Sequence, residues 1–234
     1  MRRALACLAV ISLLALAARA QQADHHQHHH HHPMLEAPTT SSPQADHSAH
    51  SHDVGPAGST NDLRWLDGMV QHHTGALRMS EFVFDIGVPG VGSLGKKIWR
   101  DQAQEIKAMR QWRKAWYPDA PVYPVVLKSD GNPDAMADLT RMSTVQIKAM
   151  QMMGSMPTRE NRVTWFLEGM IAHHGGALVM AHDALSKSSN PTIRRLARQI
   201  IVAQRREILE LRRMLKHDGL DKPEYYQFDA LFTL

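Results

Sequence analysis

Two pairs of histidines, each with methionine one helical turn away, are the residues of this sequence best suited to chemistry. Their members are Met69, His72, His73 and Met79 in the first segment, and Met170, His173, His174 and Met180 in the second. At about 100° per residue, each set occupies about 120° of one helix face. Imidazole nitrogen with thioether sulfur favours copper, above all Cu(I), because a soft ion prefers soft sulfur. Imidazole also binds Cu(II), whereas zinc held by histidine alone would leave the methionines unexplained.

The two segments belong to an internal repeat within a predicted domain over residues 61–234. Residues 67–79 align without gaps to residues 168–180. Each half therefore predicts one helical hairpin, 61–116 and 158–217, and an approximate two-fold relation between the hairpins would close a four-helix bundle. No segment alternates convincingly with period two, so the predicted fold is all-α, with duplicated αα-hairpins. In such a bundle the two histidine pairs can meet in the core.

The connection between the hairpins, residues 117–157, is expected to contain one extra helix. Asn132-Pro133 predicts its start, because asparagine caps helices and proline suits the first helical position. Asn190-Pro191 gives the same signal for the last helix of the second hairpin. The connecting helix would run to Met153 and place Met142 and Met153 on one face. Met153 is therefore a further candidate thioether ligand.

The first 20 residues have the pattern of an export signal. Arg2-Arg3, an apolar stretch from Ala4 to Ala18 and the sequence Ala18-Arg19-Ala20 match the three parts of a secretory signal peptide. The stretch is shorter than the roughly 20 residues of a membrane-spanning helix. We predict cleavage after Ala20, a periplasmic or secreted location, and no stable membrane insertion after cleavage. Cys7 lies in this segment, so the mature chain would have no thiolate ligand.

Residues 21–60 are predicted to form a disordered, histidine-rich segment. They contain ten of the sixteen histidines and few large apolar residues, a composition that cannot bury enough surface to fold. The tract His25–His32, followed by His47, His50 and His52, would bind Cu(II), Ni(II) or Zn(II) weakly and adaptably. An expression tag or a hydrophilic spacer is the alternative interpretation.

Charge and motifs limit the classes of function. Three of the 27 basic residues lie in the signal segment and 23 residues are acidic, so the remaining chain is nearly neutral and no nucleic-acid partner is expected. The arginines of the last helix are interpreted as a solvated face. Because no nucleophile-base constellation or phosphate-binding loop is present, we predict that the protein is not an enzyme. The expected partners are metal ions and a copper-donor or copper-acceptor protein.

Other functions remain open at this stage. A ferritin-like di-iron or di-manganese enzyme needs carboxylates, typically Glu-x-x-His, in the core, and no histidine here has glutamate three residues before it. Asp67 and Glu168 lie on another face of their helices, whereas Glu105 and Glu207 could enter from the neighbouring helices. The histidines of a structural helical domain would be incidental. Haem is a further alternative, although no Cys-x-x-Cys-His site is present.

The doubled Met-x-x-His-His segment, with alanine and methionine following on the same helix, resembles a bacterial family. It is the family catalogued as domain of unknown function 305, which includes the CopM-like copper-binding proteins. The resemblance covers about residues 61–216 and implies a ferritin-like four-helix bundle, export, and binding of copper or silver for copper tolerance, storage or transfer. The ligands that it implies are Met69, His72, His73, Met170, His173 and His174, with Met79, Met153 and Met180 as weaker transfers.

Overall fold

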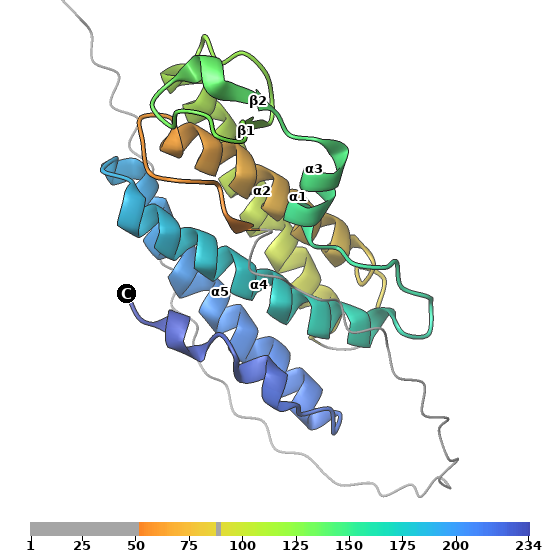
Figure 1. Cartoon of the computed structure of the whole chain (residues 1–234). Helices are drawn as coiled ribbons and strands as arrows, with labels where there is room; N and C mark the ends of the chain where they lie inside the picture. Colours follow the sequence, from red (N-terminus) through yellow and green to blue (C-terminus); the bar gives the residue numbers. More distant parts are fainter. Residues whose placement is uncertain (1–51, 88–89) are drawn as a thin grey trace, which may run out of the picture. The chain divides into compact units, whose positions relative to one another are not determined.

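The computed structural model describes residues 52–87 and 90–234, and its fold is helical (Figure 1). The long helices are α1 (Asn61–Glu81), α2 (Val91–Trp116), α4 (Arg162–Lys187) and α5 (Pro191–His217). The shorter elements are β1 (Val125–Leu127), η2 (Met136–Asp138), β2 (Leu139–Arg141), α3 (Thr144–Gln151), η3 (Pro223–Tyr226) and η4 (Asp229–Phe232). The predicted signal peptide lies outside the described residues, as does the predicted histidine-rich segment as far as residue 51.

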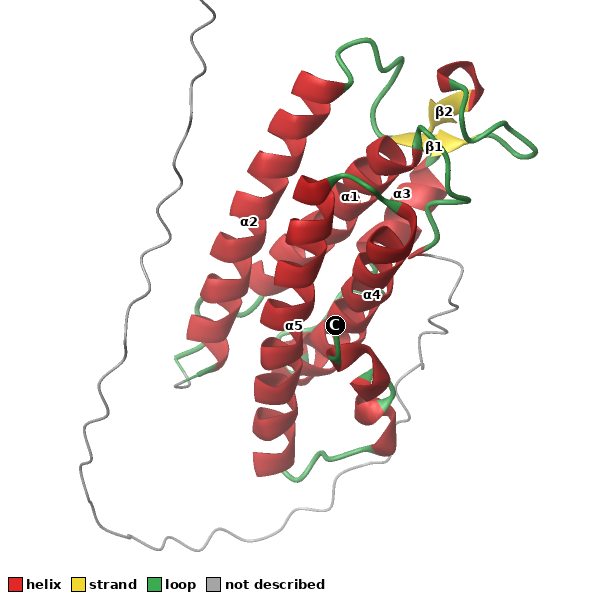
Figure 2. Cartoon of the chain, turned by 90° about the vertical axis from the view of Figure 1, so that its left-hand side faces the viewer, coloured by secondary structure: helices red, strands yellow, loops and turns green. Residues whose placement is uncertain are grey.

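The four long helices form two hairpins, as the repeat predicts. α1 packs against α2, α4 packs against α5, and the hairpins meet where α1 lies on α4. Figure 2 shows the four helices running alongside one another. One continuous hydrophobic core is buried between them, drawn from all four helices. The predicted all-α bundle of duplicated hairpins is therefore confirmed, with the small exception of the connection between them.

The connection differs from the single helix predicted between Asn132 and Met153. β1 and β2 form a two-stranded antiparallel sheet in which Val125 pairs with Arg141, and only the eight residues of α3 are α-helical. Asn132 does not cap a helix, because its side-chain oxygen accepts a hydrogen bond from the backbone N–H of Asp134 and closes a local turn.

The start and end of α3 also correct the predicted placement of the connecting methionines. Ser143 begins the helix, since its hydroxyl accepts from the backbone N–H of Gln146 while the Gln146 side chain accepts from the N–H of Ser143. Met142 precedes this cap, and the helix ends at Gln151. Met142 and Met153 therefore do not share a helix face.

The small sheet is fastened to the bundle by a buried carboxylate on α1. Asp67 accepts a hydrogen bond from the backbone N–H of Val125 at 2.8 Å and one from Nε of Arg113 at 2.6 Å. Burial raises the pKa of Asp67, and these two donors oppose that effect. Asp67 is thus committed to a structural contact away from the histidines, as its position on the helix predicts.

The chain packs against the bundle earlier than the predicted domain start at residue 61. His52 and Val54 are both buried, with exposed fractions of 6% and 5%. At the other hairpin, the predicted Asn190-Pro191 start is confirmed, because the Asn190 side chain accepts from the N–H of Thr192 and Pro191 is the first residue of α5.

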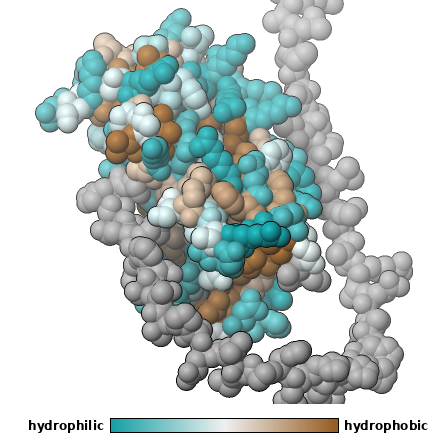
Figure 3. Space-filling model, turned by 90° about the vertical axis from the view of Figure 1, so that its right-hand side faces the viewer, coloured by the Kyte–Doolittle hydropathy of each residue, from teal (hydrophilic) through white to brown (hydrophobic). Residues whose placement is uncertain are grey.

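The surface carries scattered apolar side chains between hydrophilic ones. Figure 3 shows hydrophobic residues in small groups among hydrophilic neighbours on one face of the molecule. The most exposed large apolar residues are Val145, Leu234 and Met156. Over residues 52–87 and 90–234, no helix combines the length and the apolar character needed to cross a lipid bilayer.

Candidate metal centre

The repeated histidines His72 and His173 meet where α1 and α4 cross. Both side chains are completely buried, and their ring centroids lie 3.9 Å apart. Nε2 of His173 lies 3.0 Å from the backbone carbonyl oxygen of His72, so this ring nitrogen carries the proton and donates it. The residues therefore lie 101 positions apart in the chain but form a single contact in the core, as the repeat predicts.

The second histidine of each pair faces the other helix of its own hairpin. Nε2 of His73 lies 2.7 Å from Oε2 of Glu105 on α2, and Nε2 of His174 lies 2.9 Å from Oε2 of Glu207 on α5. The same pair of residue types thus occurs in both halves of the repeat. Glu207 also accepts from Nζ of Lys97 at 2.6 Å, which ties α2 to α5.

These contacts fix which ring nitrogen of each histidine can act as a ligand. A nitrogen that faces a carboxylate or a carbonyl oxygen carries the proton, which leaves the lone pair on the other nitrogen. In His73, His173 and His174, that other nitrogen is Nδ1, which is buried and has no hydrogen-bond partner among the described residues. In His72 and in His174, neither ring nitrogen has a hydrogen-bond partner within the described part of the chain. Nε2 of His174 lies at ion-pair distance from Glu207, whereas Nε2 of His72 faces no carboxylate there.

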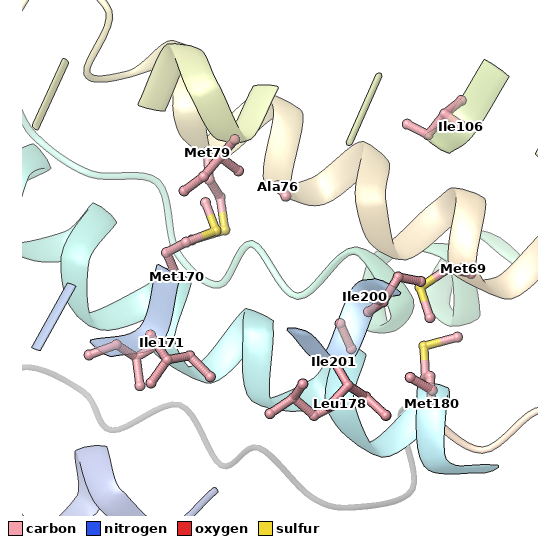
Figure 4. Close-up of a cluster of buried hydrophobic side chains, with 14 of the residues drawn as sticks. Met69, Ala76, Met79, Ile106, Met170, Ile171, Leu178, Met180, Ile200 and Ile201 are labelled. Carbon is pink, nitrogen blue, oxygen red and sulfur yellow. The ribbon is translucent and has the colours of Figure 1, made fainter. Parts of the chain in front are cut away.

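The four repeated methionines form two pairs across the same helix crossing. Figure 4 shows Met69 beside Met180, and Met79 beside Met170. All four are buried, with exposed fractions of 1% or less. Because Met69 and Met170 each precede a core histidine by three residues, each pair lies about one helical turn from the central imidazoles.

Equivalent glycines on α1 and α4 each lie beside one methionine of a pair. A Cβ atom at Gly169 would lie 2.8 Å from Cε of Met79, and one at the equivalent Gly68 would lie 3.5 Å from Cε of Met180. Glycine at position 169 therefore leaves room for Met79, whereas a Cβ atom at Gly68 would be in ordinary contact with Met180 and lies closer to Val54.

Burial keeps the central imidazoles neutral. Desolvation lowers the pKa of His72 and of His173 well below the usual value, and the neighbouring histidines lower both further. Burial alone would raise the pKa of Glu207, but the hydrogen bonds from His174 and Lys97 lower it to about 2. The neutral imidazoles of His72 and His173 therefore lie in the middle of the candidate centre. The methionine pairs lie about one helical turn away, and the carboxylates lie at the margin.

The carboxylates do not form the cluster that a di-iron or di-manganese site requires. Glu105 and Glu207 do approach from neighbouring helices, but each faces a different histidine. Glu168 instead accepts from Nζ of Lys222 at 2.7 Å and from the hydroxyl of Tyr225. Within residues 52–87 and 90–234, no three His, Cys, Asp or Glu side chains are already arranged around one point as metal ligands.

His52 and Met152, which lie outside the repeat, also lie close to the candidate centre. Nε2 of His52 contacts Sδ of Met152, and the ring of His52 lies 5.5 Å from that of His72 between centroids. The sequence assigned His52 only to the flexible histidine-rich segment. Met153 is half-buried and packs against the hydrophobic core, so its role as a ligand stays a prediction.

Comparison with known proteins places these features in a family. A family model described as "Domain of unknown function (DUF305)" matches residues 62–215. The chain belongs to the DUF305 family. The matched segment contains both hairpins and both histidine pairs, which confirms the family suggested by the doubled motif. No protein of curated function matches the sequence.

Several solved structures are similar to this chain. CopM in the Cu(II)-bound form is 23% identical with a TM-score of 0.49, over 67% of this chain and 96% of CopM. CopM co-crystallised with silver is 24% identical with a TM-score of 0.47, over the same fractions. A DUF305 fragment from Deinococcus radiodurans is 24% identical with a TM-score of 0.48, over 70% of this chain and 99% of the fragment.

Proposed function

We propose that this DUF305 protein binds copper as cargo, mainly as Cu(I), between α1 and α4. The observation that carries the proposal is the environment of His72. Its ring is fully buried, and neither ring nitrogen has a hydrogen-bond partner among the described residues. An unsatisfied buried polar group costs about 1–3 kcal/mol. A metal ion that binds to such a nitrogen would offset this cost.

The donor set selects the class of metal. Neutral imidazole and thioether are intermediate and soft ligands, and soft ligands prefer Cu(I) over hard cations such as Mg²⁺ or Ca²⁺. His72 and His173, together with Nδ1 of His73 and of His174, would supply nitrogen. The flanking pairs Met69–Met180 and Met79–Met170 would supply sulfur. Silver, as Ag(I), would fit the same donors. Cu(I), Cu(II) and silver are the metals named for the CopM structures, but the assignment to this chain comes from its own residues.

The wider proposal is copper handling outside the cytoplasm. The signal pattern at Arg2-Arg3 to Ala20 supports export to the periplasm or beyond, where tolerance, storage or transfer to a partner protein would use such a site. We assign no catalytic reaction to the site. The proposed roles of its carboxylates are structural, since they hold the protons on the imidazoles.

The carboxylates give a prediction about affinity. Replacing Glu105 and Glu207 together by glutamine should weaken Cu(I) binding about 10–100-fold, the usual effect of removing an outer group that orients a histidine ligand. Glutamine keeps the size of the side chain but no longer requires a proton on Nε2. The measurement is anaerobic competition with a coloured Cu(I) chelator. The matched control is Glu210→Gln, since the Glu210 side chain is 43% exposed and pairs loosely with Arg213; an equal loss in both would contradict this role.

The proposal itself is tested by the same titration on the full chain and on a variant with His72→Leu and His173→Leu. The histidine-rich segment is present in both proteins, so the difference reports the buried centre alone. We expect the variant to lose the tightest Cu(I) site, and we expect His217→Ala, at an exposed position, to keep it. Equal tight binding by both proteins would reject the centre, and preferential binding of Fe(II) or Mn(II) would favour the enzyme alternative.

A further inference from the structure

His52 lies beside the buried His72, and Met152 contacts His52. Both residues belong to segments outside the repeat. They lie 100 residues apart in the chain, yet Nε2 of His52 contacts Sδ of Met152. The His52 ring is tilted by 58° against the ring of His72, with 5.5 Å between centroids. His52 is 6% exposed and Met152 is half-buried. An imidazole and a thioether thus lie together between the surface and the proposed centre.

The helices of the repeat leave room for both segments at equivalent positions. Gly176 on α4 faces His52, because a Cβ atom there would lie 2.2 Å from Nε2 of His52. Gly75, the equivalent residue on α1, faces the end of α3, because a Cβ atom there would lie 1.9 Å from the carbonyl oxygen of Gln151. No real Cβ contact is that short, so alanine at Gly176 would displace the His52 side chain, and alanine at Gly75 would displace the end of α3.

The backbone at Met152 has an unusual conformation. Met152 follows the last residue of α3 and has the left-handed conformation, with φ of 48°. Residues other than glycine, asparagine and aspartate seldom adopt this region. The turn occurs at the residue that contacts His52. Close packing on two glycines and an unusual backbone at the contact residue together indicate that the position of this pair is built into the fold.

We propose that His52 and Met152 form an outer binding site for a soft monovalent cation, Cu(I) or Ag(I), which they pass to His72. This proposal rests on the proposed function of the buried centre. Transfer is a ligand exchange: the bonds to Nε2 of His52 and Sδ of Met152 break as a bond to His72 forms, and the oxidation state of the metal does not change. His52 is also the last histidine of the sequence series His47, His50 and His52.

The test is NMR of the full chain with ¹³C-labelled methionine methyl groups, titrated with Ag(I). Ag(I) is diamagnetic, and each methyl resonance reports whether its own sulfur binds metal. We expect the Met152 methyl resonance, assigned with Met152→Leu, to shift in the first part of the titration. The matched control is the methyl resonance of Met156, which is assigned with Met156→Leu. The Met156 side chain is 66% exposed, and its resonance should not shift.

Two variants test whether His52 and Met152 bind Ag(I) together. In His52→Ala, the Ag(I) concentration needed to shift Met152 should rise about 10-fold or more, as expected when a neighbouring metal ligand is lost. Gly176→Ala should have the same effect although it changes neither ligand. Met69 and Met180 should still shift in both variants, because the buried centre is intact.

The possible outcomes distinguish this proposal from the one on which it rests. If Met69, Met79, Met170 and Met180 shift while Met152 does not, the outer site is wrong and the buried centre stands. If Met152 shifts equally in the wild type and in His52→Ala, the two residues do not act as a pair. If none of these methyl resonances shifts, the buried centre fails and the outer site fails with it.

Discussion

Replacing His72 by leucine should stabilise the metal-free protein by about 1–3 kcal/mol and remove its stabilisation by copper. Leucine has nearly the same volume as histidine and carries no polar atom, so it relieves the cost of burying an imidazole without partners. The wild type should instead gain about 4 kcal/mol from free metal at 1,000 times its dissociation constant. Urea unfolding with and without anaerobic Cu(I) or Ag(I) measures both free energies.

The sign of the change in the free energy of unfolding of metal-free His72→Leu matters as much as its size. A surface control, His217→Ala, should leave both free energies of unfolding within about 0.5 kcal/mol of the wild type. A metal-free His72→Leu protein that is less stable than the wild type would indicate that the imidazole is well satisfied in the fold. His72 would then be a structural residue, and the argument for a ligand at this position would fail.

Acid should destabilise the metal-free protein strongly below about pH 6.5. The pKa values of His72 and His173 are lowered in the folded protein, mainly by burial, whereas in the unfolded chain both titrate near 6.5. Between the lowered values and 6.5 the unfolded chain therefore binds more protons, so the free energy of unfolding falls as the pH falls. With two groups, the slope can reach about 2.7 kcal/mol per pH unit.

This pH dependence can be separated from that of the acidic residues. Glu207, with a pKa of about 2, contributes stability that is lost only as the pH falls from its unfolded value near 4.5 toward 2. Urea unfolding of the metal-free chain from pH 7.5 to 5 therefore excludes the contribution of Glu207. The variant with His72→Leu and His173→Leu should have a much flatter profile over this range, and an unchanged slope would show that other groups take up the protons.

The repeated histidines and methionines of the candidate centre could be predicted from the sequence, because helical periodicity alone places them on one face. Met69 and His72 share a helix face because of helix geometry, and the same spacing in the second copy made it possible to infer that His72 and His173 meet. Those inferences needed only the repeat and the two-fold relation. The sequence also pointed to Glu105 and Glu207 as carboxylates that could enter the core, although not to their individual partners.

The features that the sequence did not predict depend on contacts between distant residues. Each strand of the sheet has only three residues, too few for an alternating pattern, and its anchor Asp67 lies 58 residues before Val125. His52 was interpreted as part of a polar tract, because composition says nothing about a contact with Met152 made 100 residues later. Such contacts leave no local signal.

The duplicated hairpins correspond to the two subunits of a symmetric dimer joined into one chain. In a true two-fold dimer every change in one subunit is copied in the other, whereas here each half can vary alone. Trp65 on α1 donates its indole N–H to the carbonyl oxygen of Met180 at 2.8 Å, but its counterpart Phe166 has no such donor. The backbone at the Met69–Met180 pair is thus anchored by a hydrogen bond from an indole, which phenylalanine cannot make at the Met79–Met170 pair. A metal ion bound between α1 and α4 would therefore meet one methionine pair that is held more rigidly than the other.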